Sequence, residues 1–124
     1  MDELHLWVGI FSGTEEEFHQ LFDLTSFYNS QEGEDFERCG FCKYLNKNSY
    51  DNDFIGHVYI ENDLQKLLDG LPSDQLTKDV LKYCKNNKLT NPNAMLYYGD
   101  EWLDGDSLAK EFEGLKYIGT FDWE

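Results

Sequence analysis

The stretch that most constrains the fold is the alternating apolar run at residues 4–11. One set of alternate positions holds Leu4, Leu6, Val8 and Ile10, and the other holds His5, Trp7, Gly9 and Phe11. Successive side chains of a β-strand point to opposite faces, so this strand would have two largely apolar faces. Such a strand belongs inside a sheet and not at its rim, and we expect residues 4–11 to form a central strand.

The rest of the chain predicts further strands and helices around this one. Short apolar runs next to turn signals predict strands at residues 54–60, 94–98 and 115–121. Four helices are predicted from their N-caps: Thr14, which forms a capping box with Glu17, then Asn62, Ser73, and either Asp106 or Ser107. In the last of these helices, Leu108 and Phe112 would face inward and Gly114 would end the helix. This order predicts an α+β fold: a single mixed, largely antiparallel sheet of about four to five strands with helices packed on it. The length of 124 residues fits one domain, residues 1–124.

The chain is strongly acidic, with 25 Asp and Glu residues against 10 Lys and Arg residues and a formal net charge of -15. Hydrophobic residues make up 40% of it, which is typical of a folded protein and not of a disordered acidic tail. A charge of this size repels nucleic acid and anionic membranes and attracts basic partners. We therefore expect no direct binding to nucleic acid or to a membrane. The competing explanation is that the acidic charge serves only to keep the protein soluble.

The N-terminus and the cysteines indicate a cytoplasmic protein. The first residues include Asp2 and Glu3 and lack the basic region of a signal peptide, and no run reaches the roughly 18 apolar residues of a membrane span. Three cysteines are an odd number, which suits a reducing compartment better than a disulfide scaffold.

Residues 31–56 show no sustained helical or strand period before Asp53. The stretch is acidic on both sides of Cys39 and Cys42, and it carries Tyr44 and Tyr50. Long irregular segments in small domains are usually functional or disordered, and aromatic residues argue against disorder. We interpret this stretch as an ordered binding surface, in which residues 39–45 form an apolar anchor and the acidic flanks meet a partner.

A second acidic and aromatic cluster, residues 97–106, competes with the first as a binding surface. Tyr and Trp side chains ringed by charge are typical of tight interfaces, and interleaving with acids favours a basic protein partner. The predicted partner-binding residues are Glu32, Glu34, Asp35, Glu37, Tyr50, Asp51 and Asp53 in the first cluster and Tyr98, Asp100, Glu101, Trp102, Asp104 and Asp106 in the second. The competing interpretation is that the aromatic residues belong to the core and the acids to a solvated rim.

Cysteine and histidine side chains offer an alternative, a small metal or redox protein. Cys39 and Cys42 have C-x-x-C spacing, but a zinc site would need a second such pair, and only Cys84 and three histidines remain. No nucleophile motif, Gly-rich phosphate loop or zinc-protease pattern supports catalysis. We therefore predict a protein that is not an enzyme and that holds no cofactor and no metal.

Short motifs along most of the chain resemble the bacterial immunity protein 22 family, antitoxins of polymorphic and contact-dependent toxin systems. The resemblance rests on the opening HLWVGIF followed by the Glu-rich TEEEF, on FCKY at Phe41–Tyr44, and on YDNDFIG at Tyr50–Gly56. It implies a single α+β domain that binds and neutralises one cognate toxin, with no catalytic residues to carry over. Such toxins are commonly nucleases, whose basic clefts suit an acidic inhibitor.

These observations predict an immunity protein that blocks a basic toxin domain by stoichiometric binding, as a monomer in a 1:1 complex. Acidic residues would speed association, and aromatic residues would slow dissociation. The alternative is an acidic adaptor or nucleic-acid mimic that binds many basic proteins weakly.

Overall fold

The computed structural model describes residues 3–30, 38–47, 50, 55–61, 63–71, 73–89, 91–99, 103 and 108–122. Within these ranges the strands are β1 (Glu3–Gly9), β2 (Ile55–Tyr59), β3 (Ala94–Tyr98), β4 (Glu111–Phe112) and β5 (Leu115–Asp122). The helices are α1 (Glu15–Gln20), α2 (Thr25–Asn29), α3 (Gly40–Leu45), α4 (Leu64–Leu68) and α5 (Asp74–Asn86). None of these described helices is long and apolar enough to cross a membrane.

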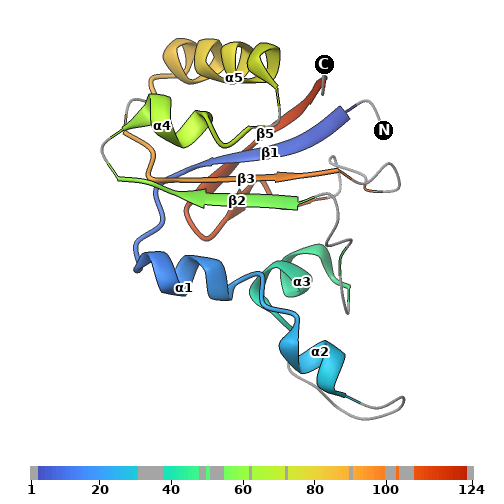
Figure 1. Ribbon diagram of the computed structural model, residues 1–124. Helices are drawn as coiled ribbons and strands as arrows, with labels where there is room; N and C mark the ends of the chain where they lie inside the picture. Colours follow the sequence, from blue (N-terminus) through green and yellow to red (C-terminus); the bar gives the residue numbers. More distant parts are fainter. Residues whose placement is uncertain are drawn as a thin grey trace.

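The strands form one antiparallel sheet in the order β2-β3-β1-β5-β4, with β1 in the middle (Figure 1). β1 pairs with β3 on one side, where Leu6 lies opposite Tyr97, and with β5 on the other, where Leu6 lies opposite Gly119. The predicted α+β fold and the central position of the first strand are confirmed. Ile10, which the alternation places inward, is 61% exposed because β1 ends at Gly9.

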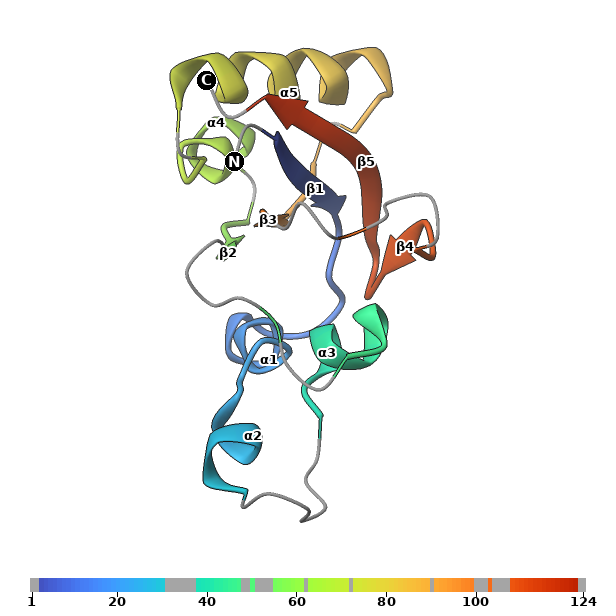
Figure 2. The same cartoon turned by 90° about the vertical axis from the view of Figure 1, so that its right-hand side faces the viewer.

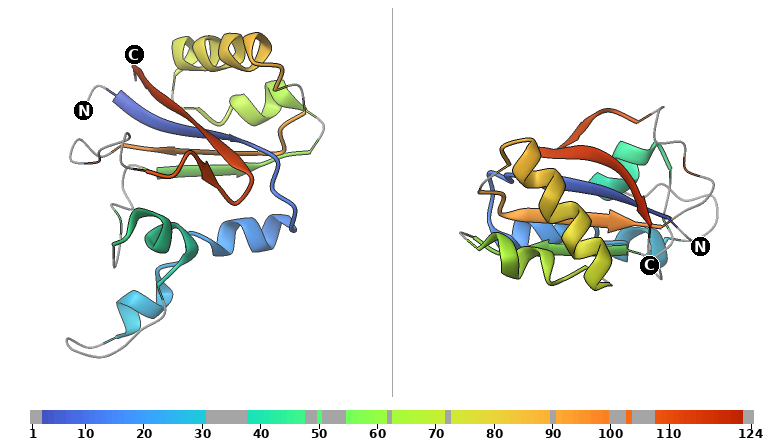
Figure 3. Two further views of the ribbon diagram at one scale, coloured as in Figure 1. Left: turned by 180° about the vertical axis from the view of Figure 1, so that it is seen from behind. Right: turned by 90° about the horizontal axis from the view of Figure 1, so that it is seen from above.

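Helices cover both faces of this sheet. α4 and α5 lie on one face, and α1 and α3 lie on the other, with α2 farther from the sheet than either of them (Figures 1 and 2). Seen from above, α5 crosses the strands obliquely (Figure 3). Glu3 and Asp122 are paired in β1 and β5, so the described chain begins and ends at the same end of the sheet.

Each face of the sheet has its own hydrophobic core because both sides of β1 are apolar. Leu6 belongs to the core beneath α4 and α5, and the next residue, Trp7, belongs to the core beneath α1 and α3; both are fully buried. Full burial of a leucine side chain contributes roughly 1.5–3 kcal/mol. The α4–α5 core includes Leu4, Leu6, Val8, Leu68, Leu76, Val80 and Met95, and the α1–α3 core includes Trp7, Phe18, Phe22, Phe41, Leu96 and Tyr98.

Side-chain caps determine where α1 and α5 begin. Thr14 Oγ1 accepts the Glu17 N–H at 3.2 Å, and the Glu17 carboxylate accepts the Thr14 N–H at 3.0 Å. This pair confirms the predicted capping box. Ser73 caps α5 as predicted, since its Oγ accepts the Leu76 N–H at 3.2 Å.

The helix α4 is shifted by one residue from its prediction. Its N-cap is Asp63, not the predicted Asn62, because the Asp63 carboxylate accepts the Lys66 N–H at 3.0 Å. The helix ends at Leu68, with Asp69 as its C-cap and Gly70 just beyond it, where a helix-terminating glycine is expected.

The predicted last helix is wrong, because residues 111–112 form β4 of a hairpin with β5. The spacing of Leu108 and Phe112 is helical, but Phe112 pairs with Leu115 across a two-residue turn. Glu113 (φ 52°) and Gly114 (φ 88°) both have positive φ, as a type I′ hairpin turn requires. The predicted caps of this helix, Asp106 and Ser107, lie outside the described residues.

α3 lies within residues 31–56, where the sequence predicted no helix. Its six residues are fewer than two turns, too few to show a helical repeat of apolar positions. Phe41, Cys42 and Leu45 are buried, so the predicted apolar anchor at residues 39–45 is confirmed. The five-residue helix α2 is a second element that the sequence did not predict.

Candidate functional site

The candidate site is centred on Phe41, which is fully buried where α3 meets the sheet. The rings of Tyr50 and Tyr98 both contact it edge-on, with centroids 5.3 and 5.4 Å away. The two tyrosine rings also contact each other at 6.1 Å. Such aromatic pairs contribute about 0.5–1.5 kcal/mol each beyond their buried area. Phe41, Tyr50 and Tyr98, called the aromatic hub below, therefore hold α3, residue 50 and the end of β3 together.

Backbone contacts fix α3 at both of its ends. The Phe41 N–H donates to the Leu21 carbonyl at 2.9 Å, which ties the start of α3 to the end of α1. At the other end, Asn46 adopts a left-handed conformation (φ 59°), and the Lys47 N–H donates to the Cys42 carbonyl at 3.0 Å. This arrangement satisfies carbonyl groups at the helix C-terminus, so α3 has a defined start and end despite its length.

Tyr44 connects α3 to the sheet and to the residues before β4. Its hydroxyl accepts a hydrogen bond from Trp7 Nε1 at 3.0 Å and donates one to the Ala109 carbonyl at 2.5 Å. Burial raises the pKa of Tyr44, and the bond from Trp7 acts in the opposite direction. The hydroxyl therefore stays protonated, as its donor role requires.

Two of the predicted partner-binding residues, Tyr50 and Tyr98, lie within the described residues. Tyr50 is 8% exposed and donates its hydroxyl hydrogen to the Phe22 carbonyl, and Tyr98 is 1% exposed. Burial is the main cause of a strongly raised pKa for Tyr50, so its hydroxyl is neutral at pH 7. Both side chains are core residues, as the competing interpretation of the aromatic clusters expects, and they can support a surface above them.

Three acidic segments of the sequence directly precede or follow, along the chain, elements that the aromatic hub joins. Residues 31–37 lead into Arg38 and α3, residues 51–54 lead into β2, and residues 100–106 follow the end of β3. Ile55 at the start of β2 pairs with Tyr98 at the end of β3, and the hub joins Tyr98 to α3. The other predicted partner-binding residues lie outside the described residues; they are Glu32, Glu34, Asp35, Glu37, Asp51, Asp53, Asp100, Glu101, Trp102, Asp104 and Asp106.

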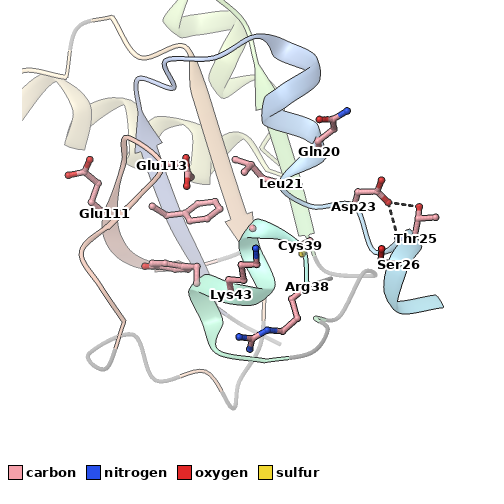
Figure 4. Close-up of a pocket in the computed structure, with 13 residues that line it drawn as sticks. Gln20, Leu21, Asp23, Thr25, Ser26, Arg38, Cys39, Lys43, Glu111 and Glu113 are labelled. Atoms are coloured by element: carbon pink, nitrogen blue, oxygen red, sulfur yellow. Dashed lines mark hydrogen bonds between the residues drawn. The ribbon is translucent and has the colours of Figure 1, made fainter. Parts of the chain in front are cut away.

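An open groove of about 930 Å³ lies beside α3 (Figure 4). Its charged lining residues are Asp23, Arg38, Lys43, Glu111 and Glu113. Asp23 accepts hydrogen bonds from the Thr25 hydroxyl at 2.5 Å and from the Thr25 N–H at 2.9 Å, and these lower the pKa of its carboxyl. Charges of both signs distinguish this groove from the mostly apolar pockets that bind small molecules.

Cys39 and Cys42 lie at the start of α3 and not in the loop that the sequence predicted. Cys39 is the N-cap, its Sγ accepts the Cys42 N–H at 3.2 Å, and the two Sγ atoms lie 2.8 Å apart. Burial, followed by the hydrogen bond with Cys39, raises the pKa of Cys42 to about 12. Within the described ranges, no group of three or more His, Cys, Asp or Glu side chains is arranged to hold a metal ion.

His19 and His57 form a contact that the sequence did not indicate. Their Nδ1 atoms lie 2.6 Å apart and join α1 to β2, and His57 also stacks on Phe22 with ring centroids 4.3 Å apart. Burial, followed by the charge of His19, lowers the pKa of His57 to about 4. His57 is therefore uncharged at pH 7, and its Nδ1 can share one hydrogen with Nδ1 of His19. The two residues are far apart in the sequence, so only the packing of α1 on the sheet reveals the pair.

Nearly the whole chain, residues 4–124, matches the model of a protein family described as Immunity protein 22. The matched residues include the aromatic hub, the cysteine pair and the groove. A search of curated proteins and a search of solved structures each returned no match. The family description supports an antitoxin role and implies a cognate toxin as the partner. With this coverage, the chain belongs to the Immunity protein 22 family.

Proposed function

We propose that the protein neutralises a basic bacterial toxin domain, with a nuclease as the best candidate, by stoichiometric binding in the cytoplasm. The complex would hold one copy of each protein, and inhibition would come from binding and not from catalysis. Family membership supports the antitoxin role, and the net charge of -15 supports a basic partner. Nuclease domains suit this charge because their clefts attract phosphate groups.

The observation that carries the proposed site is the attachment of three acidic segments around one buried aromatic hub. Residues 31–37, 51–54 and 100–106 contain ten of the 25 acidic residues of the chain. The β2–β3 pairing and the ring contacts of Phe41 join the described residues from which these segments leave. The two clusters that the sequence presents as rivals are then parts of one proposed surface.

The charge of the opposite face supports the same choice of surface. Lys78, Lys82 and Lys85 are exposed on α5, on the other side of the sheet from α3 (Figure 1). This face also carries acidic residues such as Asp69 and Asp79, so its charges largely balance, and it attracts a basic toxin less than the proposed acidic surface would. Steering of this kind speeds association, and added salt weakens it.

The test mixes the full chain with its cognate toxin domain, which is sought first in the adjacent gene. A 1:1 complex and loss of toxin activity at equimolar amounts are the expected results. The double variant Asp51→Lys with Asp53→Lys should slow association by at least about tenfold and flatten its salt dependence. The matched control is Asp69→Lys with Asp79→Lys, which changes the net charge equally on the α4–α5 side.

Each alternative result has a defined meaning. Absence of a complex with the toxin would refute the proposal. Equal slowing by both double variants would show that net charge acts without a defined site. Unchanged binding after reversal of Asp51 and Asp53 would move the site to Asp100 and Asp104, and equally tight binding to unrelated basic proteins would favour the acidic adaptor.

A further inference from the structure

We propose that Cys39 and Cys42 form a reversible dithiol–disulfide site that reacts with low-molecular-weight disulfides such as glutathione disulfide. This site lies at the start of α3. It does not depend on the proposed function, because it holds whether or not a toxin binds near α3.

The geometry places the two sulfur atoms ready for bond formation. They lie 2.8 Å apart, and a disulfide bond is about 2.05 Å long, so closure needs a sulfur movement of less than about 1 Å. Cys39 is the N-cap of α3 and Cys42 is the third helical residue, which brings both side chains to the same side of the first turn. Rotation of the side chains is therefore enough to form the bond, without a rearrangement of the helix.

The two thiols differ in accessibility, which gives them different roles. Cys39 is half-buried and lines the groove beside α3 (Figure 4), whereas Cys42 is fully buried. The Cys42 N–H points at Cys39 Sγ and can stabilise negative charge there during the reaction. Burial raises the pKa of Cys42, so this group is a protonated thiol until it reacts. Cys39 is thus the attacking sulfur and Cys42 the resolving sulfur.

The reaction consists of two balanced thiol–disulfide exchanges. Cys39, as a thiolate, attacks one sulfur of glutathione disulfide, forms a mixed disulfide and expels one glutathione thiolate, which takes up the proton that Cys39 lost. Cys42 Sγ then attacks Cys39 Sγ and gives its proton to the second glutathione thiolate as it leaves. The two protein thiols are oxidised by two electrons in total, and one glutathione disulfide is reduced to two glutathione molecules.

Cys84 provides an internal comparison within the same chain. It is fully buried in the core beneath α5, and burial raises the pKa of its thiol to about 11. The two sulfurs at the start of α3 are 2.8 Å apart, whereas Cys84 lies in the core on the other face of the sheet. Cys84 is therefore expected to remain a free thiol under conditions that oxidise the pair.

The experiment is intact-mass spectrometry of the full chain after incubation with glutathione disulfide, followed by peptide mapping. The wild-type protein should lose two hydrogen atoms, carry no glutathione, and return to its original mass with dithiothreitol. Cys42→Ala should accumulate one glutathione on Cys39, because the resolving thiol is missing. Cys39→Ser should accumulate none while it is folded, and serine is itself a good N-cap for α3. The control Cys84→Ser should form the same disulfide as the wild-type protein.

Several results would overturn the proposal. A wild-type chain that stays reduced, or that takes up one glutathione on each of Cys39 and Cys42, would exclude the disulfide. An oxidation that dithiothreitol does not reverse would exclude a reversible site. Equal glutathione uptake by Cys42→Ala and Cys39→Ser, with circular dichroism showing that both are folded, would exclude the assigned roles.

Discussion

Replacing Phe41 with leucine tests whether the aromatic hub supports the proposed toxin-binding surface. The fully buried ring contacts the aromatic rings of Trp7, Phe22, Tyr44, Tyr50, Tyr98 and Phe112, at centroid distances of 5.3 to 6.3 Å. Leucine removes about three carbon atoms, which costs ~2 kcal/mol at about 0.8 kcal/mol per buried methylene. Loss of the edge-to-face contacts adds about 1 kcal/mol. We therefore expect Phe41→Leu to lower the free energy of unfolding by about 2–3 kcal/mol.

Urea denaturation of the full chain measures this change, and Val80→Ala is the matched control. Val80 is fully buried in the core beneath α5, and its two lost methyl groups cost ~2 kcal/mol. Both variants should remain folded, because domains typically have about 5–15 kcal/mol of stability. Toxin affinity, measured at pH 7 without urea, should fall for Phe41→Leu and stay unchanged for Val80→Ala. Only Phe41→Leu loosens the aromatic hub.

Two results would refute this reasoning. A loss of less than about 0.5 kcal/mol in Phe41→Leu is the size of a surface substitution, and it would mean that the ring is not closely packed. Equal losses of toxin affinity in Phe41→Leu and Val80→Ala would mean that general stability matters and the hub does not.

The remaining predictions concern the hairpin and the histidine pair. Gly114→Ala should cost about 3 kcal/mol or more, because Gly114 has a φ of 88° and an added Cβ would lie 2.1 Å from the Ile10 carbonyl oxygen. Gly119→Ala, with a φ of 104° and open space around the added Cβ, should cost only backbone strain of about 1–2 kcal/mol, and thermal unfolding of the two variants checks the difference. The pKa of His57 is lowered to about 4, whereas an unfolded histidine titrates near 6.5, so the unfolded chain binds more protons between these values. The contribution of His57 to stability is therefore fully present above about pH 6.5 and is lost as the pH falls toward 4, by ~1–2 kcal/mol after allowance for solvent screening. Urea midpoints at pH 7 and pH 4.5 should differ less for His57→Gln than for the wild-type protein, and equal differences would contradict the assignment.

Helix starts could be predicted where one side chain decides them. Thr14 and Ser73 each accept an N–H of their own first turn, a local interaction that depends on few neighbouring residues. The start of α4 was harder, because Asn62 and Asp63 both have side chains that cap helices well, and the sequence does not show which of them accepts the Lys66 N–H. Central placement of β1 could also be predicted, because its two apolar faces both require cover.

Tertiary contacts determined the parts that the sequence did not predict. Phe112 has helical spacing from Leu108, but pairing with β5 and the positive φ of Glu113 make residues 111–114 a hairpin. A positive φ at a glutamate leaves no clear signal in the sequence, since glutamate rarely adopts it. α3 begins at a cysteine, which is not among the usual N-cap residues, so its start was also hidden.

The candidate site could be predicted only in outline. The acidic and aromatic composition predicted Tyr50 and Tyr98 as partner-binding residues, whereas both are buried. Tyr50 comes from an irregular segment, where no periodicity shows whether a ring faces inward. Tyr98 ends β3, and its alternation with Ala94 and Leu96 places all three in the same core. The burial of both tyrosines depends on Phe41, whose position follows from the docking of α3 onto α1. The His19–His57 pair depends on the same packing of helices against the sheet.

The two faces of the sheet differ in a way that suits the proposed function. The core beneath α5 is mainly aliphatic and needs only to fill its volume. The core beneath α3 has hydrogen bonds from Tyr50 to the Phe22 carbonyl, from Trp7 to Tyr44, and from Tyr44 to the Ala109 carbonyl. Directional bonds of this kind fix the relative positions of chain segments, which aliphatic contacts do less strictly. On the proposed surface the acidic segments would repel one another, since two like charges 4 Å apart in water repel by about 1 kcal/mol. The proposed basic toxin would relieve this repulsion when it binds, so we expect its stabilisation of the fold to be largest at low salt.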